Sequence, residues 1–275
     1  MLEIVGWTTR PAGCAAAVRR SLVAALVALV TFPVSANLRA PRRVPESPST
    51  ALAAPAKGLV VERERLTFLC GAEACDVTAE YDVTAEAQER VRLEMILPVP
   101  GDVTARTNGA PGAVSVVPAR PFRAEELRGL PEPGPGEPPL HRAAFDAELR
   151  EGTNTITVRY RQPLGGEEVG HSSRRAGRFV QRFRYELWPL REWTRGAGFR
   201  IRLAIGVERP APGLWQRWFG HSRSVACLTS DPAAPSVEGR LEQRGERLWL
   251  EAELSPTFPD RITCYVGDDD LMPRY

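Results

Sequence analysis

The sequence predicts a mainly-β protein: an antiparallel β-sandwich with long proline-rich loops and little helix. Apolar and polar residues alternate along many short segments, which is the pattern of strands that bury one face and expose the other. Turn residues separate these segments at the spacing of hairpins. No segment has the periodicity of a long amphipathic helix, and only residues 123–130 fit one short helical turn. This set of elements is typical of sandwiches rather than of alternating β/α folds.

The chain is long enough and apolar enough to build an ordered core. Its 275 residues are 43% apolar and 25% charged, and they include 6 tryptophans and 9 phenylalanines. This composition excludes global disorder and allows one large or two small domains.

The first 36 residues have the pattern of an export signal. Arg19 and Arg20 precede an apolar run over residues 22–32, and Val34-Ser35-Ala36 supplies the small residues of a cleavage site. The alternative is an uncleaved anchor, but this run is short for the ~20 apolar residues that a bilayer span needs. We therefore predict that residues 1–36 are a cleaved signal peptide. The mature protein, without a stable transmembrane span, is expected to be periplasmic, cell-surface or secreted.

The net charge gives no reason to expect nucleic acid as a partner. Residues 1–36 contain three arginines and one glutamate, so this segment accounts for the whole net charge of +2. The mature chain is therefore close to neutral, and it lacks the excess of basic residues that nucleic-acid binding requires.

The chain after the signal divides into three parts. Residues 37–57 are rich in Pro, Ala and Ser, and they predict a flexible tether. Residues 58–209 hold most of the alternating segments and predict the β-sandwich. A cluster of Pro and Gly then interrupts the pattern. Residues 210–275 are expected to supply C-terminal strands that complete the sandwich or form a small subdomain. Within the sandwich, residues 130–140 contain five prolines and predict an exposed loop.

The two-residue alternation identifies which face of each predicted strand is buried. Residues 149–160 are expected to form a hairpin, because turn residues at 151–154 separate two apolar faces. The buried faces predicted in this way are Val91/Leu93/Met95/Leu97, Phe145/Ala147/Leu149, Ile156/Val158/Tyr160, Phe179/Gln181/Phe183/Tyr185/Leu187, Phe199/Ile201/Leu203/Ile205, Leu248/Leu250/Ala252/Leu254 and Ile262/Cys264/Val266.

Four cysteines remain after the predicted cleavage, and an even number in an exported chain favours disulfides. Cys70 ends one alternating face and Cys75 begins the next. If residues 71–74 form a hairpin loop, Cys70 faces Cys75 and both apolar faces stay intact. Cys227 then pairs with Cys264 by elimination. The alternative for the first pair is a metal site, but this spacing without a nearby histidine is poor for zinc.

Two segments resemble parts of known families. The Gly152-x-Asn154-x-Ile156-x-Val158-x-Tyr160 spacing is similar to a hairpin of β-sandwich modules in exported bacterial proteins. Tyr185-x-Leu187-x-Pro189, followed by Trp193, resembles a feature of exported bacterial sandwich families of uncharacterised function. These resemblances imply a fold and a compartment, and they carry no catalytic residue to this chain.

The sequence offers little catalytic or metal-binding chemistry. Gly220-His221-Ser222-Arg223-Ser224 resembles the nucleophile elbow of α/β-hydrolases, although Ser224 replaces the last glycine and no β/α alternation surrounds it. An exported serine hydrolase centred on Ser222, with His221 or His171 nearby, is therefore the alternative to a non-catalytic protein.

No metal and no cofactor are predicted. The three histidines, of which His141 is the first, are far apart in the sequence and are expected to be solvated. Asp260 and the acidic run at 268–270 lack the alternating oxygen ligands and the glycine of a calcium loop.

The most unusual local feature is a segment rich in arginine and aromatic residues. On a strand, Arg182, Arg184 and Trp188 share one face. Together with Arg191 and Trp193, they are candidates for binding an anionic or sugar ligand by bidentate hydrogen bonds and stacking. The alternative is a solvated face whose arginines pair with neighbouring glutamates.

We therefore expect an exported, non-catalytic envelope protein that binds or scaffolds an envelope component or a protein partner. The apolar periodicity is accounted for by the core, and no carboxylate pair, triad or metal cluster is left over. If the arginine face binds an anionic polymer, its affinity should fall steeply with salt.

Overall fold

The computed structural model describes residues 43–44, 49–53, 58–97, 103–118, 141–169, 178–209, 222–231, 233–234, 236–254 and 257–273. All the described residues belong to one compact unit within residues 41–275. The predicted signal peptide, the helical turn at 123–130 and the proline-rich loop at 130–140 lie outside the described residues. Within these residues, no helix is long and apolar enough to cross a bilayer.

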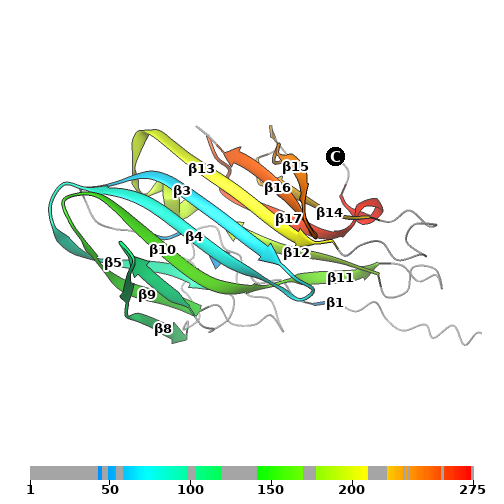
Figure 1. Ribbon diagram of the computed structural model, residues 1–275, viewed down its shortest axis with the longest axis horizontal. Helices are drawn as coiled ribbons and strands as arrows, with labels where there is room; N and C mark the ends of the chain where they lie inside the picture. The colour runs from blue at the N-terminus through cyan, green and yellow to red at the C-terminus, as the bar shows by residue number, and fades with distance from the viewer. Residues whose placement is uncertain are drawn as a thin grey trace, which may run out of the picture. The chain divides into compact units, whose positions relative to one another are not determined.

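The largest sheet contains eight strands within the described residues. Figure 1 shows its long strands β13, β3, β4 and β10 lying side by side. Their alternating apolar residues point to one face and are buried, as predicted. The spatial order is β15 (Arg240–Arg244), β16 (Arg247–Leu254), β13 (Thr194–Glu208), β3 (Leu59–Cys70), β4 (Ala74–Ala85), β10 (Gly152–Pro163), β6 (Thr104–Thr107) and β7 (Ala110–Gly112).

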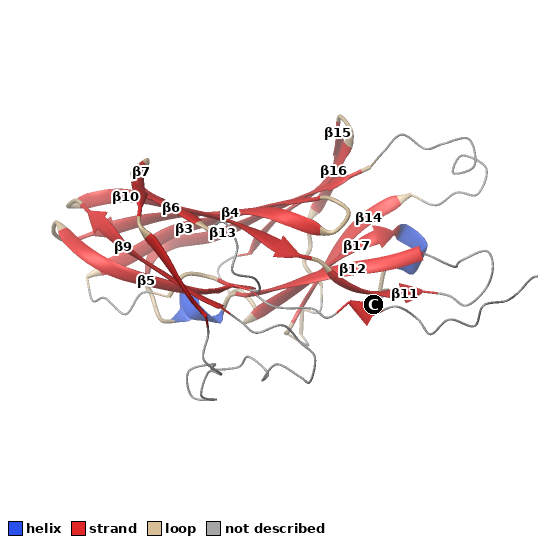
Figure 2. Ribbon diagram, turned by 90° about the horizontal axis from the view of Figure 1, so that it is seen from below, coloured by secondary structure: helices blue, strands red, loops and turns tan. Residues whose placement is uncertain are grey.

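A second sheet, of six described strands, forms the opposing layer (Figure 2). The Phe68 ring of β3 stacks on the Phe183 ring of β12 with 4.5 Å between centroids, so the two sheets share one core. The order is β1 (Arg43–Val44), β11 (Gly165–Val169), β12 (Arg178–Glu186), β17 (Arg261–Asp268) and β14 (Arg223–Thr229), with β2 (Ser49–Thr50) beside β12.

The remaining described elements are three strands and two short helices. β5 (Glu89–Leu97), β9 (His141–Leu149) and β8 (Val114–Pro118) form a third sheet, in that order. The 3₁₀ helix η1 (Trp188–Arg191) follows β12, and η2 (Asp269–Leu271) follows β17. Among the C-terminal strands, β16 pairs with β13 and β17 pairs with β12.

The fold is mainly β, as predicted, but its sheets are mixed rather than purely antiparallel. β13 runs parallel to β3, and β2 runs parallel to β12. Alternation predicts which face of a strand is buried, but it carries no information on the direction of the neighbouring strand. Parallel neighbours need a long connection. The chain between β3 and β13 provides one, because it passes through the other two sheets.

The turn after Leu149 joins two sheets instead of closing the predicted hairpin. β9 pairs with β5 and β8, whereas β10 pairs with β4 and β6. The side-chain amide of Asn154 closes the turn by donating to the carbonyls of Arg150 and Gly152 at 2.8 and 2.9 Å. Gly152 has a φ of +86°, which glycine adopts without strain. The sequence therefore predicted the turn correctly, but it did not predict that the two strands flanking the turn belong to different sheets.

Residues 49–53, which fall within the predicted tether, form a strap inside the sandwich. Ser49 to Leu52 are at most 2% exposed. β2 pairs with β12 of the six-stranded sheet, and Ala53 pairs with Glu94 of β5. The strap therefore connects two sheets. Its side chains are small or apolar and uncharged, which permits this burial, whereas the prolines that predicted a tether lie on either side.

The first predicted disulfide, between Cys70 and Cys75, is confirmed. Both residues are buried at the tip of the β3–β4 hairpin. The predicted register is also confirmed, because Phe68 lies opposite Val77 and Cys70 opposite Cys75.

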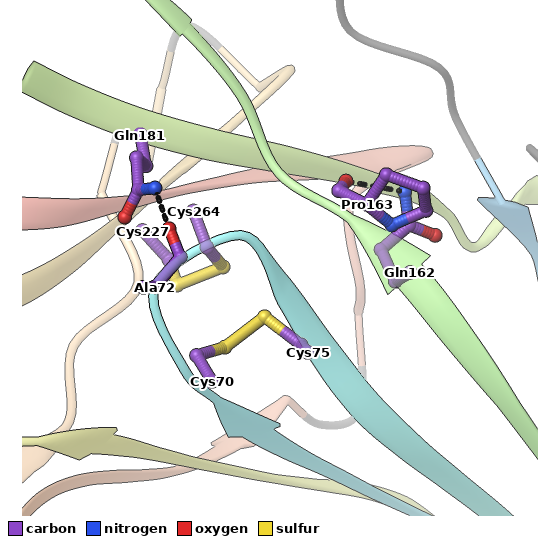
Figure 3. The surroundings of a disulfide bond; sticks show 8 residues. All are labelled: Cys70, Ala72, Cys75, Gln162, Pro163, Gln181, Cys227 and Cys264. Carbon is purple, nitrogen blue, oxygen red and sulfur yellow. Dashed lines mark hydrogen bonds between the residues drawn. A yellow bond between two sulfur atoms is a disulfide. The ribbon is translucent and has the colours of Figure 1, made fainter.

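The second predicted disulfide, between Cys227 and Cys264, is also confirmed. These cysteines lie opposite each other on β14 and β17. Figure 3 shows the surroundings of the two disulfides, where the amide of Gln181 on β12 donates to the carbonyl of Ala72 at the hairpin tip. The hairpin of one sheet is thus tied directly to a strand of the other.

The two disulfides should contribute differently to stability. The Cys227–Cys264 bond joins residues separated by 37 positions, and the Cys70–Cys75 bond joins residues separated by 5. In the loop-entropy account, the free energy of unfolding falls by about 3 to 4 kcal/mol in C227A/C264A and by about 2 kcal/mol in C70A/C75A. Urea unfolding of the two double variants measures both losses. A larger loss in C70A/C75A would contradict this account.

Candidate functional site

A groove beside η1 contains two of the predicted binding residues, Trp188 and Arg191. Its volume is about 570 Å³. The rest of its lining comes from the ends of β12 and β14 and from the start of β17, three strands that are neighbours in the six-stranded sheet. The lining residues are Glu186, Trp188, Arg191, Glu192, Ser230, Asp260 and Arg261.

The position of Trp188 is fixed by the segment that precedes β17. Pro189 lies at the start of η1, where a missing N–H costs nothing. The backbone N–H of Trp188 donates to the carbonyl of Asp260 at 3.0 Å. Arg191, at the other end of η1, forms an ion pair with the Asp260 carboxylate at 2.7 Å and donates to the Phe258 carbonyl at 3.2 Å. Both ends of the short helix are therefore held against the same segment.

Ion pairs of both signs line the groove. Arg261 donates from Nε to the Glu186 carboxylate at 2.7 Å, and Arg184 Nε lies 3.2 Å from the same oxygen. Burial raises the pKa of Glu186, while the charges of Arg261 and Arg184 oppose this shift. The lining contains two arginines and three carboxylates, so the groove has no excess of positive charge.

The other predicted binding residues lie outside the groove lining. Arg182 and Arg184 are partly buried on β12, on the face opposite Phe183 and Tyr185, as the alternation predicts. Trp193 is only 5% exposed, and its indole N–H donates to the carbonyl of Leu52 in the strap at 2.9 Å. Trp193 is therefore a core residue, and its ring is not available to stack on a ligand.

Three described arginines of this region, Arg191, Arg200 and Arg202, lie beside carboxylates from later segments of the chain. Arg200 and Arg202 on β13 lie 3.7 and 3.5 Å from the Glu253 carboxylate on β16. Arg191 has the Asp260 carboxylate as its partner. These carboxylates follow the arginines by many residues in the sequence, so a local count of charges could not reveal them.

The described part of the chain gives Ser222 no catalytic arrangement. Ser222 immediately precedes β14, and its hydroxyl donates to the Asp269 carboxylate at 2.7 Å. A nucleophile elbow places the serine after a strand and before a helix. Here a strand follows the serine, which is the wrong order. His171 and His221 lie outside the described residues.

The remaining histidine and the acidic residues show no metal site. His141 was expected to be solvated, but it begins β9, faces Leu97 across the β5–β9 ladder and is 8% exposed. Asp260 and Asp268 lie at opposite ends of β17, since the strand spans the residues between them. Among the described residues, no group of three or more His, Cys, Asp or Glu is arranged to hold a metal ion.

The core contains a polar cluster that sequence analysis did not predict. Glu64 on β3 is fully buried, and its Oε1 accepts a hydrogen bond from the Tyr185 hydroxyl at 3.2 Å. The Tyr81 and Tyr185 hydroxyls lie 3.3 Å apart. The Tyr160 hydroxyl donates to Ser49 Oγ of the strap at 2.9 Å. One carboxyl group and three tyrosines therefore meet between the sheets.

The apolar alternation along β3 could have identified Glu64 from the sequence. Glu64 shares its strand face with Leu66 and Phe68, both of which are buried. A register shift between Val61 and Arg63 moves the pattern by one residue and places Glu64 opposite Tyr81. A charged residue in phase with a buried face thus marks the cluster in the sequence.

The environment of Glu64 favours its neutral form. Burial raises the pKa of Glu64 from 4.5 to about 7, and hydrogen bonds from Tyr81 and Tyr185 only partly oppose this shift. Within the described residues, Oε2 of Glu64 makes no hydrogen bond. A buried carboxyl group that titrates near neutral pH is a common property of functional sites.

The fold of this chain is similar to that of solved bacterial structures. A Legionella pneumophila protein described as a "putative nutrient binding protein" aligns with 83% of this chain and 73% of its own, at 10% identity and a TM-score of 0.51. An identity this low shows the fold alone. No protein-family model and no curated protein matches the sequence.

Two peptidase-related structures align more weakly. An M1 zinc metallopeptidase from Deinococcus radiodurans aligns with 78% of this chain at 14% identity and a TM-score of 0.38. Yeast LTA4 hydrolase aligns with 86% of it at 11% identity and a TM-score of 0.36. The aligned parts are 43% and 33% of those proteins, and TM-scores this low support no functional argument.

Glu64 should make stability depend on pH. Between the unfolded pKa near 4.5 and the folded value of about 7, the unfolded chain loses the proton and the folded chain keeps it, so stability falls as pH rises and then levels off. Relative to the wild type, Glu64→Gln should gain up to about 3 kcal/mol at pH 8 and little at pH 4. Urea unfolding of both proteins at pH 4, 6 and 8 measures the difference. A difference that does not change with pH would sink this assignment.

Proposed function

We propose that this chain is an exported, non-catalytic binding protein whose groove at η1 takes a neutral, polyhydroxylated ligand such as a saccharide. The observation that carries the proposal is the composition of one groove, whose lining combines Trp188 with the ion pairs Arg191–Asp260 and Arg261–Glu186. An indole can stack on the apolar face of a sugar ring. Each sugar hydroxyl both donates and accepts hydrogen bonds. It can therefore bond to the arginines, which donate, and to the carboxylates, which accept, in the lining of the groove.

The charge balance favours a neutral ligand over an anionic polymer. An anion approaching Arg191 or Arg261 would compete with the carboxylates of Asp260 and Glu186, which already lie at 2.7 Å. Arginines that are neutralised in this way release few counterions on binding. The expectation of steep salt dependence, drawn from the arginine content, therefore does not extend to the groove.

Three features support export and a binding role. The first 36 residues have the pattern of a signal peptide. The two disulfides suit an oxidising compartment outside the cytoplasm. The likeness to the Legionella pneumophila protein is compatible with a binding role.

Binding should depend on Trp188 and change little with salt. Isothermal titration of soluble oligosaccharides should give a Kd that rises at least about 10-fold in Trp188→Ala, because removing the indole exposes apolar area of the sugar face, and about 60 Å² of such area corresponds to about 1.4 kcal/mol. Trp249→Ala is the matched control, because Trp249 is also partly exposed but lies on β16 and does not line the groove. A panel of anionic polysaccharides at low and high salt is measured in parallel. Binding only to the anionic panel, or an unchanged Kd in Trp188→Ala, would overturn the proposal.

Export should produce a mature chain that begins near Asn37. Cleavage there retains the strap, which the sandwich needs because residues 49–53 lie in its core. Intact-mass analysis of protein recovered from the cell envelope or the medium identifies the N-terminus. A full-length product found only in the cytoplasm, or an N-terminus beyond Ser49, would contradict export by this route.

A further inference from the structure

Leu241 is the one exposed large hydrophobic residue in the described part of the chain, with 50% of its surface exposed. It lies on β15, which pairs with β16 alone among the described strands and forms one edge of the eight-stranded sheet (Figure 1). Leu241 lies opposite Leu250 of β16, which is buried, so its side chain is on the core-facing side of the sheet. A single exposed leucine is ordinary by itself, but this one continues an apolar row to a free sheet edge.

The backbone of β15 offers unpaired hydrogen-bonding groups beside this leucine. β15 ends at Arg244 and β16 begins at Arg247, so a two-residue turn joins them. Gly245, at its first central position, has a φ of +60°, and the residues that flank such a turn exchange both backbone hydrogen bonds. Because inward and outward groups alternate along an antiparallel strand, the N–H and C=O of Leu241 and Gln243 point away from β16. A free edge of this kind is a template for another strand.

The charges on the opposite side of β15 alternate in sign. Arg240, Glu242 and Arg244 share this side, because they are two residues apart on a strand. Arg244 donates to the carboxylates of Glu242 at 2.8 Å and of Glu251 at 2.6 Å. Arg240, in contrast, forms no ion pair with a described residue. An edge strand with charges of one sign repels a second copy of itself, whereas a strand with both signs can attract one.

We propose that β15 pairs in antiparallel fashion with β15 of a second copy of this chain, with the two Leu241 residues opposite each other on a two-fold axis. In this register, Arg240 of each copy lies opposite Glu242 of the other and gains the carboxylate that its own chain does not provide. The outward N–H and C=O groups of the two Leu241 residues exchange hydrogen bonds. Each copy contributes the same surface, as a two-fold dimer requires. The two eight-stranded sheets are then joined edge to edge.

The sequence of β15 favours this register over its two neighbours. A register centred on Glu242 would place Glu242 opposite itself and Arg240 opposite Arg244, and like charges directly opposite each other are destabilising. A register centred on Gln243 would place Leu241 opposite the turn that joins β15 to β16, so the leucine would stay exposed. Only the register centred on Leu241 buries the leucine and pairs opposite charges at once.

Disulfide formation between copies tests the register. In Leu241→Cys, the two new thiols lie on residues whose Cα atoms are about 5.5 Å apart, which a disulfide can span, so mild oxidation should give mostly covalent dimer on a non-reducing gel. Gln243→Cys is the matched control, because it adds a thiol to the same exposed strand and the same side, but the two Gln243 positions lie roughly 14 Å apart. Cross-linking of Gln243→Cys to the same or a greater extent, or of neither variant, would overturn the proposal.

Charge reversal tests the pairing of Arg240 with Glu242 by sedimentation of the full chain. Arg240→Glu and Glu242→Arg each place like charges opposite each other at both ends of the pairing, so each should raise the Kd of the dimer at least about 10-fold. An equimolar mixture of the two variants should dimerise as well as the wild type, because each copy supplies the sign that the other lacks. A wild type that is monomeric at every concentration, or a mixture no better associated than its components, would overturn the proposal.

Discussion

The sandwich depends on the hydrogen bonds of its strap, because residues 49–53 satisfy polar groups that the sheets leave inside the core. The Tyr160 hydroxyl donates to Ser49, the Trp193 indole donates to the Leu52 carbonyl, and Tyr81 accepts the Leu52 N–H. A buried polar group without a partner costs about 1 to 3 kcal/mol. The two tyrosines come from β10 and β4 of the eight-stranded sheet and the tryptophan from the loop before β13, so removing the strap would leave three polar groups unpaired at once.

This dependence explains why the fold was only partly predictable. Alternation identified the buried faces of the long strands, because burial of one face imposes a two-residue period whatever the neighbours are. It also gave the Cys70–Cys75 register, which is set within one hairpin. The parallel pairing of β3 with β13 and the position of the strap depend on contacts between distant segments. A run of five small or apolar residues between prolines carries no periodic signal, so its burial could not be predicted from the sequence.

The charge partners of the candidate binding residues could not be predicted either, because they also come from distant segments of the chain. The sequence places arginines close together, and it correctly puts Arg182 and Arg184 on the face of β12 opposite Phe183. It does not show that Glu253 on β16 lies beside Arg200 and Arg202, or that Asp260, just before β17, lies beside Arg191. Once Glu253 and Asp260 are in place, the region offers paired charges rather than a positive field. The chemistry expected of the site changes from attraction of anions to recognition of hydroxyl groups.

Glu64 is the residue at which local sequence preference and the fold conflict most strongly. A leucine in its place would suit the alternating face of β3 and remove the cost of burying a carboxyl group. The same substitution would leave the Tyr185 hydroxyl without its acceptor, and through Tyr81 it would weaken the bond to the strap. The carboxyl group, the tyrosines and the strap therefore form one hydrogen-bonded unit, in which position 64 needs a residue that can accept a hydrogen bond. The property of that unit that remains free to vary is the proton on Glu64, because burial raises the pKa of this carboxyl group to about 7.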